Sequence, residues 1–163
     1  MNSSGIWYFI LWMHYLALAL WIGGMVVVSA VVAPSVHGSM VSKALAGEII
    51  GKVLSRLNSI ELLCASILIG TLTSSIHFIS TGLSVSYLLL TVGTMGLITL
   101  FYAFHLTPKM KTLREGTLNF YDLSPEHAVK KEFRRLHKLY VNLMSLNLVL
   151  GLAVLYASLR VIQ

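Results

Sequence analysis

Residues 6–33 read IWYFILWMHYLALALWIGGMVVVSAVVA, an apolar run without Asp, Glu, Lys or Arg that opens with Trp7, Tyr8 and Trp12. A helix of about 20 apolar residues crosses the roughly 30 Å of hydrocarbon in a bilayer. Aromatic rings near the end of such a run suit the interface between membrane and water. This stretch therefore predicts a membrane-spanning helix that ends at Pro34.

Three further apolar runs follow, at residues 60–80, 84–106 and 140–159. None of them alternates as the strands of a β-barrel do, and a helix satisfies its own backbone groups in lipid. Of the chain, 56% is hydrophobic and 11% charged, against about 25% charged in a soluble domain. We expect an all-α integral membrane four-helix bundle, with residues 1–163 as one domain in a lipid bilayer.

The lysines and arginines lie between these runs, with the exception of Arg160. They occupy residues 34–59 and 107–139, whereas the N-terminus and the turn between the second and third runs have none. Because cytoplasmic loops are enriched in Lys and Arg, both segments are expected in the cytoplasm and both termini outside. The net charge of +6 then faces anionic lipid, and no nucleic acid partner is expected.

The two basic segments also carry helix signals. Residues 44–57 have apolar side chains at helical spacing, which predicts an interfacial helix or a lead-in to the second span. Ser124 and Pro125 predict a helix start, so that the fourth helix projects into the cytoplasm. Pro108 predicts a kink or break below the third span, and Gly116 a later stop.

Small residues recur along the spans and permit close helix packing, within the bundle or in a homodimer. They include Gly23, Gly24, Ser66, Gly70, Ser74, Gly93 and Gly96. We expect a homodimer.

Ionisable side chains within a membrane are costly and are therefore the first candidates for function. Each of the four predicted helices supplies one histidine. His14 and His77 belong to the outer half of the predicted bundle, and His105 and His137 to its inner interface. Imidazole pairs on facing helices can hold haem by bis-histidine ligation. The pattern predicts haem b, with these four histidines as the metal ligands.

Cations close to the inner histidines fit this interpretation, because haem propionates attract them. They are Arg134, Arg135 and Lys138, beside His137, and Lys109. Such a protein would transfer electrons, with quinone or another redox partner, and haem-dependent oxidoreductase activity stays open. Histidines at this depth are also common as amphipathic boundary residues, an alternative that stays open for all of them except His14. His37 and His127 are expected to be solvated in loops.

Glu61 opens the second span and has two interpretations. It is either an interfacial carboxylate paired with Arg56 or with the basic start of the fourth helix, or a proton or cation relay site. Cys64 and the methionines offer soft sulfur ligands, which suit a transporter or resistance protein for copper or other soft metals. A cofactor-free accessory subunit of a membrane complex is the remaining alternative.

The first span has a histidine followed by Trp-Ile-Gly-Gly, from His14 to Gly24. This stretch resembles the opening of the copper-resistance D-like membrane proteins. Over nearly the whole chain the sequence is more similar to a poorly characterised four-helix bacterial family that resembles the cisplatin-resistance-associated transmembrane proteins. The motifs that carry this likeness are Leu106-Thr107-Pro108, Arg135-Leu136-His137 and Asn142-Leu143.

The resemblance implies a multi-pass protein of the bacterial cytoplasmic (inner) membrane. It draws attention to His14, Trp21, Gly24, Pro108, His137 and Asn142. Bacterial haem-associated protoporphyrinogen oxidases also begin with a histidine-bearing helix, which implies haem by analogy. This chain lacks the intramembrane lysine of those proteins, so that porphyrinogen oxidation is not expected.

Overall fold

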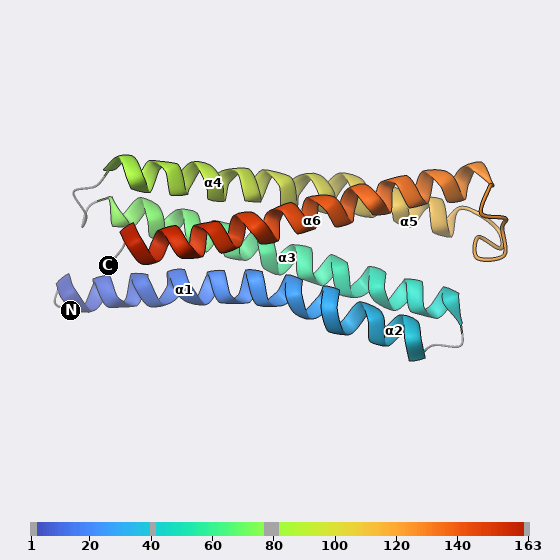
Figure 1. Ribbon diagram of the computed structural model, residues 1–163, viewed down its shortest axis with the longest axis horizontal. Helices are drawn as coiled ribbons and strands as arrows, with labels where there is room; N and C mark the ends of the chain where they lie inside the picture. Colours follow the sequence, from blue (N-terminus) through green and yellow to red (C-terminus); the bar gives the residue numbers. More distant parts are fainter. Residues whose placement is uncertain (1–2, 40–41, 77–81, 162–163) are drawn as a thin grey trace.

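The computed structural model describes residues 3–39, 42–76 and 82–161, and this part of the chain is all-helical (Figure 1). Four helical segments within it are long and apolar enough to cross a membrane, Gly5–Ser39, Lys43–Ser75, Ser84–Glu115 and Ala128–Val161. The chain is thus a membrane four-helix bundle, which confirms the predicted fold class.

The four segments are divided into eight elements. In chain order they are α1 (Ser3–Val27), η1 (Val28–Val32), α2 (Ala33–Ser39), α3 (Lys43–Ser75), α4 (Gly82–Phe101), η2 (Tyr102–Leu106), α5 (Thr107–Glu115) and α6 (Ala128–Val161). The elements η1 and η2 are short π-helical turns.

A π-helical turn precedes both Pro34 and Pro108. Proline has no N–H to donate, and its ring crowds the carbonyl four residues back. The wider turn instead lets the residue before each proline donate to a carbonyl five residues back, Ala33 to Val28 and Thr107 to Tyr102. The helix continues past each proline. The expected end of the first span at Pro34 is therefore wrong, and the expected break at Pro108 is replaced by a π turn.

Two of the predicted boundaries are confirmed and one is wrong. Residues 44–57 form a lead-in to the second span, because α3 runs unbroken from its cap, where Ser42 accepts from the Leu45 amide at 3.3 Å. Gly116 ends α5, and its amide donates to the Thr112 carbonyl at 2.8 Å. The fourth helix begins at Ala128, about one turn later than Ser124 and Pro125 predicted.

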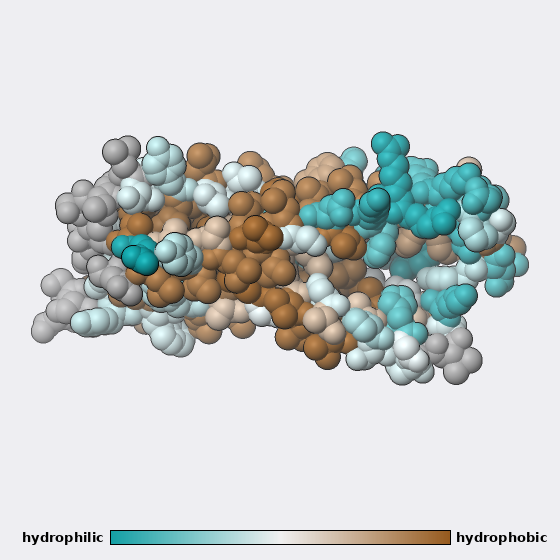
Figure 2. Space-filling model, viewed as in Figure 1, coloured by the Kyte–Doolittle hydropathy of each residue, from teal (hydrophilic) through white to brown (hydrophobic). Residues whose placement is uncertain are grey.

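Each long helix packs against two others, in the order α1, α3, α4, α6 and back to α1. The start of α1 and the end of α6 lie at one end of the bundle (Figure 1). We call the opposite end, with α2, α5 and the first turns of α3 and α6, the basic end. Figure 2 shows apolar side chains over the middle of the bundle and hydrophilic ones gathered at the basic end. That the basic end faces the cytoplasm stays a prediction.

Three glycines lie where two helices approach each other closely. A Cβ at Gly24 would lie 2.8 Å from Leu57, one at Gly151 would lie 3.1 Å from Ile22, and one at Gly96 would touch Ala65 at 3.6 Å. Close approach of this kind gains van der Waals contact, which drives helix association in lipid. A Cβ at Gly23, Gly70 or Gly93 would meet no atom of the described residues within 4 Å.

Candidate functional site

Glu61 is completely buried on the inward face of α3. The Tyr102 hydroxyl donates a hydrogen bond to its Oε2, while its Oε1 has no partner among the described residues. Arg56 is exposed, and no ion pair joins it to Glu61 in the described part of the chain. The predicted interfacial pair, with Arg56 or with the basic start of the fourth helix, is therefore wrong, and Glu61 is a carboxyl group buried in the core of the bundle.

Two further side chains, Thr99 and Asn147, tie the Tyr102 hydroxyl into the core. It lies 3.0 Å from the hydroxyl of Thr99. The Asn147 amide donates to the Thr99 hydroxyl at 3.0 Å and to the Met95 carbonyl at 3.2 Å. Glu61, Thr99, Tyr102 and Asn147 are each 0% exposed. Hydrogen bonds thus connect α3, α4, η2 and α6 around one carboxyl group.

A second set of bonds lies nearer the basic end. The Tyr140 hydroxyl donates to the Asn58 side-chain oxygen at 2.8 Å, and the Asn58 amide donates to the Thr107 hydroxyl at 3.3 Å. The rings of Tyr140 and Tyr102 pack with centroids 4.9 Å apart. Asn58 precedes Glu61 by three residues and so shares its helix face. We refer to Asn58, Glu61, Thr99, Tyr102, Thr107, Tyr140 and Asn147 as the polar cluster.

The π turn η2 helps to build the cluster. It begins at Tyr102 and ends just before Thr107, and the Thr107 hydroxyl donates back to the Tyr102 carbonyl at 2.9 Å. That carbonyl therefore accepts from both the amide and the hydroxyl of Thr107. Single π turns within α-helices are frequent at functional sites.

Three buried side-chain atoms lack a partner in the described residues, Trp21 Nε1, Glu61 Oε1 and Asn147 Oδ1. Leaving such an atom unpaired costs about 1–3 kcal/mol. The close approach of Gly24 to Leu57 fixes the register of α1 against α3. Trp21 lies three residues from Gly24 and Glu61 four residues from Leu57, both away from the basic end. At 1.5 Å of rise per residue, these steps are about 4.5 Å and 6 Å along the helix axes. One donor and one acceptor without partners therefore lie at a similar depth in the core.

His14 is buried near the end of the bundle opposite the basic end. Its Nδ1 lies 2.9 Å from the Thr71 hydroxyl and its Nε2 lies 3.0 Å from the Ser158 hydroxyl. Thr71 donates its own hydrogen to the Leu68 carbonyl, so Nδ1 is the donor to Thr71, and Nε2 can accept from Ser158. Both ring nitrogens are engaged, whereas an iron ligand needs a free one.

Of the other histidines predicted as ligands, the structure describes His105 and His137, and it does not bring these two together. His77 lies outside the described residues. His105 is exposed on η2 and stacks on Phe101 with ring centroids 5.4 Å apart. His137 lines a cleft at the basic end. No contact joins two of His14, His105 and His137, and the described residues contain no group of three or more His, Cys, Asp or Glu that could hold a metal ion.

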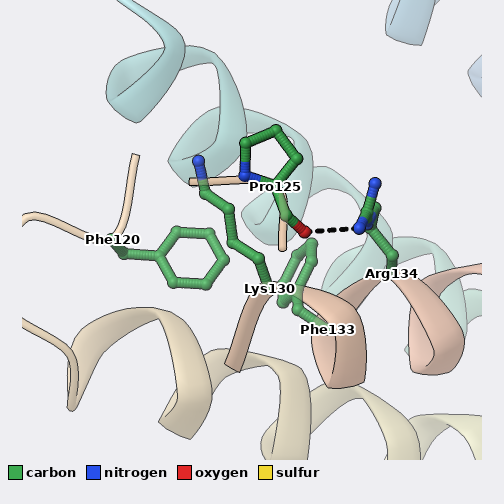
Figure 3. A pocket seen from close by; sticks show the side chains of 5 residues that line it. All are labelled: Phe120, Pro125, Lys130, Phe133 and Arg134. Atoms are coloured by element: carbon green, nitrogen blue, oxygen red, sulfur yellow. Dashed lines mark hydrogen bonds between the residues drawn. The ribbon is translucent and has the colours of Figure 1, made fainter. Parts of the chain in front are cut away.

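The cations predicted for propionates are exposed, and one of them is bonded to the loop before α6. Arg135 and Lys138 are exposed. Figure 3 shows Arg134 donating to the Pro125 carbonyl, beside Lys130 and the rings of Phe120 and Phe133. Lys130 donates to the carbonyls of residues 121 and 123, at 2.9 and 2.6 Å. Arg134 and Lys130 therefore anchor the loop between α5 and α6.

A cleft of about 630 Å³ opens at the basic end. Residues of α2, α3, α5, the loop after α5 and α6 line it. Thr107 lines it and is also a member of the polar cluster. The hydrogen bond from Asn58 to Thr107 therefore links the bundle core to this cleft.

Sequence reasoning found Glu61 but missed its partners. The signal that could have found them is the spacing of polar residues within the apolar runs. Thr99 and Tyr102 are three residues apart, and Tyr140 and Asn147 are seven apart. Either spacing places both members of a pair on one helix face. The resemblance drew attention to Asn142, yet Asn142 is exposed.

The fold and the polar cluster define a small multi-pass membrane protein with a carboxyl group buried at its centre. The chain belongs to the family described as a domain of unknown function, DUF4149, whose model matches residues 16–117. No curated protein and no solved structure matches the chain. The family match agrees with the expected uncharacterised family, but it gives no support to the expected likeness to copper-resistance or cisplatin-resistance proteins.

Proposed function

We propose that this protein exchanges protons within the membrane as a small transport protein, with Glu61 as the proton-binding group. The observation that carries the proposal is the fully buried carboxyl group with one hydrogen-bonded and one unpartnered oxygen. Ionisable residues within membrane spans are costly to bury and mark proton and ion pathways.

The hydrogen bonds of Glu61 suit a reversible proton site. Tyr102 holds Oε2 and is itself held by Thr99. The carboxyl group therefore keeps its position whether or not Oε1 carries a proton. The proton would enter at the basic end, where Thr107 lines the cleft and bonds to Asn58 one turn from Glu61.

On α3, the buried side chains that directly follow Glu61 away from the cleft are apolar. Along α3 the buried residues that follow are Cys64, Ala65 and Leu68, and the next buried polar residue is Thr71, the partner of His14. Thr71 lies ten residues, or about 15 Å, beyond Glu61. This apolar layer would close the path on one side while the cleft opens it on the other, as a carrier with alternating access requires.

Proton flux into liposomes tests the proposal. The purified protein is reconstituted with a pH-sensitive dye inside the vesicles, and a pH step is applied with the membrane potential clamped. We expect faster acidification than in empty liposomes, reduced to the empty rate by Glu61→Gln. Glu126→Gln is the matched control, because Glu126 is an exposed carboxylate outside the cleft, paired with Lys131 at 2.7 Å. Equal rates for wild type and Glu61→Gln would refute the proposal.

Carbodiimide labelling gives a second measurement on the wild-type protein. Dicyclohexylcarbodiimide is apolar and reacts with protonated carboxyl groups. Mass spectrometry should find the adduct on Glu61 and not on Glu48, even if a Glu61 variant folds poorly. An unlabelled Glu61 in a protein labelled elsewhere would contradict a protonated site at this position.

A second candidate is a b-type haem protein with an electron-transfer role, and the cleft is what favours it. His37 and His137 both line this cleft beside Lys43, Lys111 and Arg114, which suit propionates. Visible spectra of the oxidised and reduced protein test this candidate. A Soret band lost in His137→Ala but kept in the variant of exposed His105 would support it, and a featureless spectrum after expression with ample haem would remove it.

Other features of the sequence interpretation stay predictions. They are quinone as a redox partner, soft-metal transport through Cys64, a homodimer, a place in a larger membrane complex, and location in the bacterial inner membrane.

A further inference from the structure

We infer that the cleft at the basic end binds the headgroup of an anionic phospholipid. The inference does not require the proton site, because the cations that would hold the headgroup are not members of the polar cluster, although the same cleft is the proposed proton entry. It rests on the size of the cleft, the charges that line it and its place at one end of a membrane bundle.

The cleft combines cations with an apolar wall. Its cationic side chains are Lys43, Lys52, Lys111 and Arg114, and its apolar side chains include Ile50, Leu54, Met110, Phe120 and Phe133. A volume of about 630 Å³ is within the range of small-molecule sites, about 300–1,000 Å³. An anion with an apolar body would match both kinds of wall.

The charges in the cleft are not balanced. Glu48 pairs with Lys52 at 2.6 Å, and Glu115 lies 3.6 Å from Arg114. Within the described residues no ion pair involves Lys43 or Lys111, which leaves two ammonium groups uncompensated. The N-terminus of α3, which begins at Lys43, adds the positive end of a helix dipole. The cleft therefore offers positive charge to a ligand.

Two glycines shape the cleft from the side of α3. A Cβ at Gly51 would lie 3.2 Å from the Arg114 guanidinium, and Arg114 donates to the Gly47 carbonyl at 2.7 Å. A Cβ at Gly47 would lie 2.3 Å from the Tyr121 hydroxyl oxygen. Arg114 is therefore held in place, with its side chain only 16% exposed, while Lys43 and Lys111 are exposed and free to reach a ligand.

A phospholipid suits this position better than a freely soluble anion. Basic pockets between membrane helices bind anionic headgroups, because the lipid is already held at the right depth and is abundant there. Phe104 on η2 is 70% exposed, and acyl chains would lie against apolar side chains of this kind. The phosphate would lie at Lys43, Lys111 and Arg114, with the glycerol backbone along the apolar wall.

Native mass spectrometry of the full chain tests the inference. The detergent-solubilised protein is titrated with phosphatidylglycerol and, in parallel, with phosphatidylcholine. We expect phosphatidylglycerol to bind more tightly than phosphatidylcholine. In the double variant Lys43→Gln/Lys111→Gln the affinity for phosphatidylglycerol should fall roughly 10- to 30-fold, because each lysine contributes one basic contact to the headgroup. Lys43→Arg/Lys111→Arg keeps the charge and should bind within about two-fold of wild type.

A control with the same loss of charge separates the cleft from the general field of the basic end. Arg135 and Lys138 are exposed at this end and do not line the cleft. Arg135→Gln/Lys138→Gln should keep phosphatidylglycerol binding, and equal weakening in both double variants would overturn the inference. Displacement of the lipid by equimolar glycerol phosphate would also overturn it, since the site would then be one for a soluble phosphate.

Discussion

The Tyr102 hydroxyl donates to Glu61 Oε2, and through this bond the π turn η2 is joined to the middle of α3. Tyr102 is also bonded to Thr99 on the preceding helix. It therefore connects the carboxyl group to the rest of the polar cluster.

Tyr102→Phe removes the donor to Glu61 and leaves both carboxyl oxygens without a partner. We expect a loss of about 1–3 kcal/mol in the free energy of unfolding, the cost of an unsatisfied buried group. Denaturant unfolding in detergent measures it. Tyr87→Phe is the control, since Tyr87 is 70% exposed on α4 and should change nothing. Equal stability of the Tyr102 variant and wild type would show that the bond does not hold Glu61.

Asn147→Leu should destabilise the bundle, whereas Asn142→Leu should not. Asn147 bonds to Thr99 and to the Met95 carbonyl, while Asn142 is exposed. Hydrogen bonds between membrane helices contribute about 0.6–2 kcal/mol each. Thermal unfolding of the two variants side by side gives the comparison, and a larger loss at Asn142 would contradict the position of α6 in the bundle.

His14→Phe should lower stability by about 1–3 kcal/mol, because buried Thr71 and Ser158 each lose a partner. The triple variant that also carries Thr71→Val and Ser158→Ala removes the stranded hydroxyls and should recover part of that loss. Double-mutant analysis of unfolding curves measures the coupling. Additive losses would mean that the imidazole does not bond to these hydroxyls.

Gly47→Ala should displace the loop that follows α5. Its Cβ would lie 2.3 Å from the Tyr121 hydroxyl, and overpacking of this kind costs about 1–3 kcal/mol. Tyr121→Phe in the same chain removes the clashing oxygen and should restore stability. Gly70→Ala on the same helix meets nothing within 4 Å and should be neutral or slightly stabilising. Hydrogen exchange of residues 116–127 would report the displacement.

The four spans could be predicted from the sequence because hydropathy is a local property of each run. The continuation of the helices past Pro34 and Pro108 could not, because proline alone does not distinguish a break from a π turn. The depth of His105 along its helix was predictable, but its outward direction depends on how that helix is rotated. Asn142 and Asn147 show the same limit, since five residues separate an exposed position from a buried one.

Glu61 stood out because a carboxyl group in an apolar run is rare. Its partners come from three other segments, at positions 99, 102 and 147. Tyrosine, threonine and asparagine are ordinary residues in a membrane helix, so only their convergence in space shows their role.

The turn η2 also fixes the angular phase of everything that follows it. A π turn holds one residue more than an α turn, and one residue corresponds to about 100° of rotation around the helix axis. If one residue were removed from Tyr102–Leu106, α5 would rotate by this angle relative to α4. Lys111 and Arg114 would then swing away from the face that α5 turns to α3. The extra residue in η2 thus determines which side of α4 faces the core and which side of α5 faces the cleft.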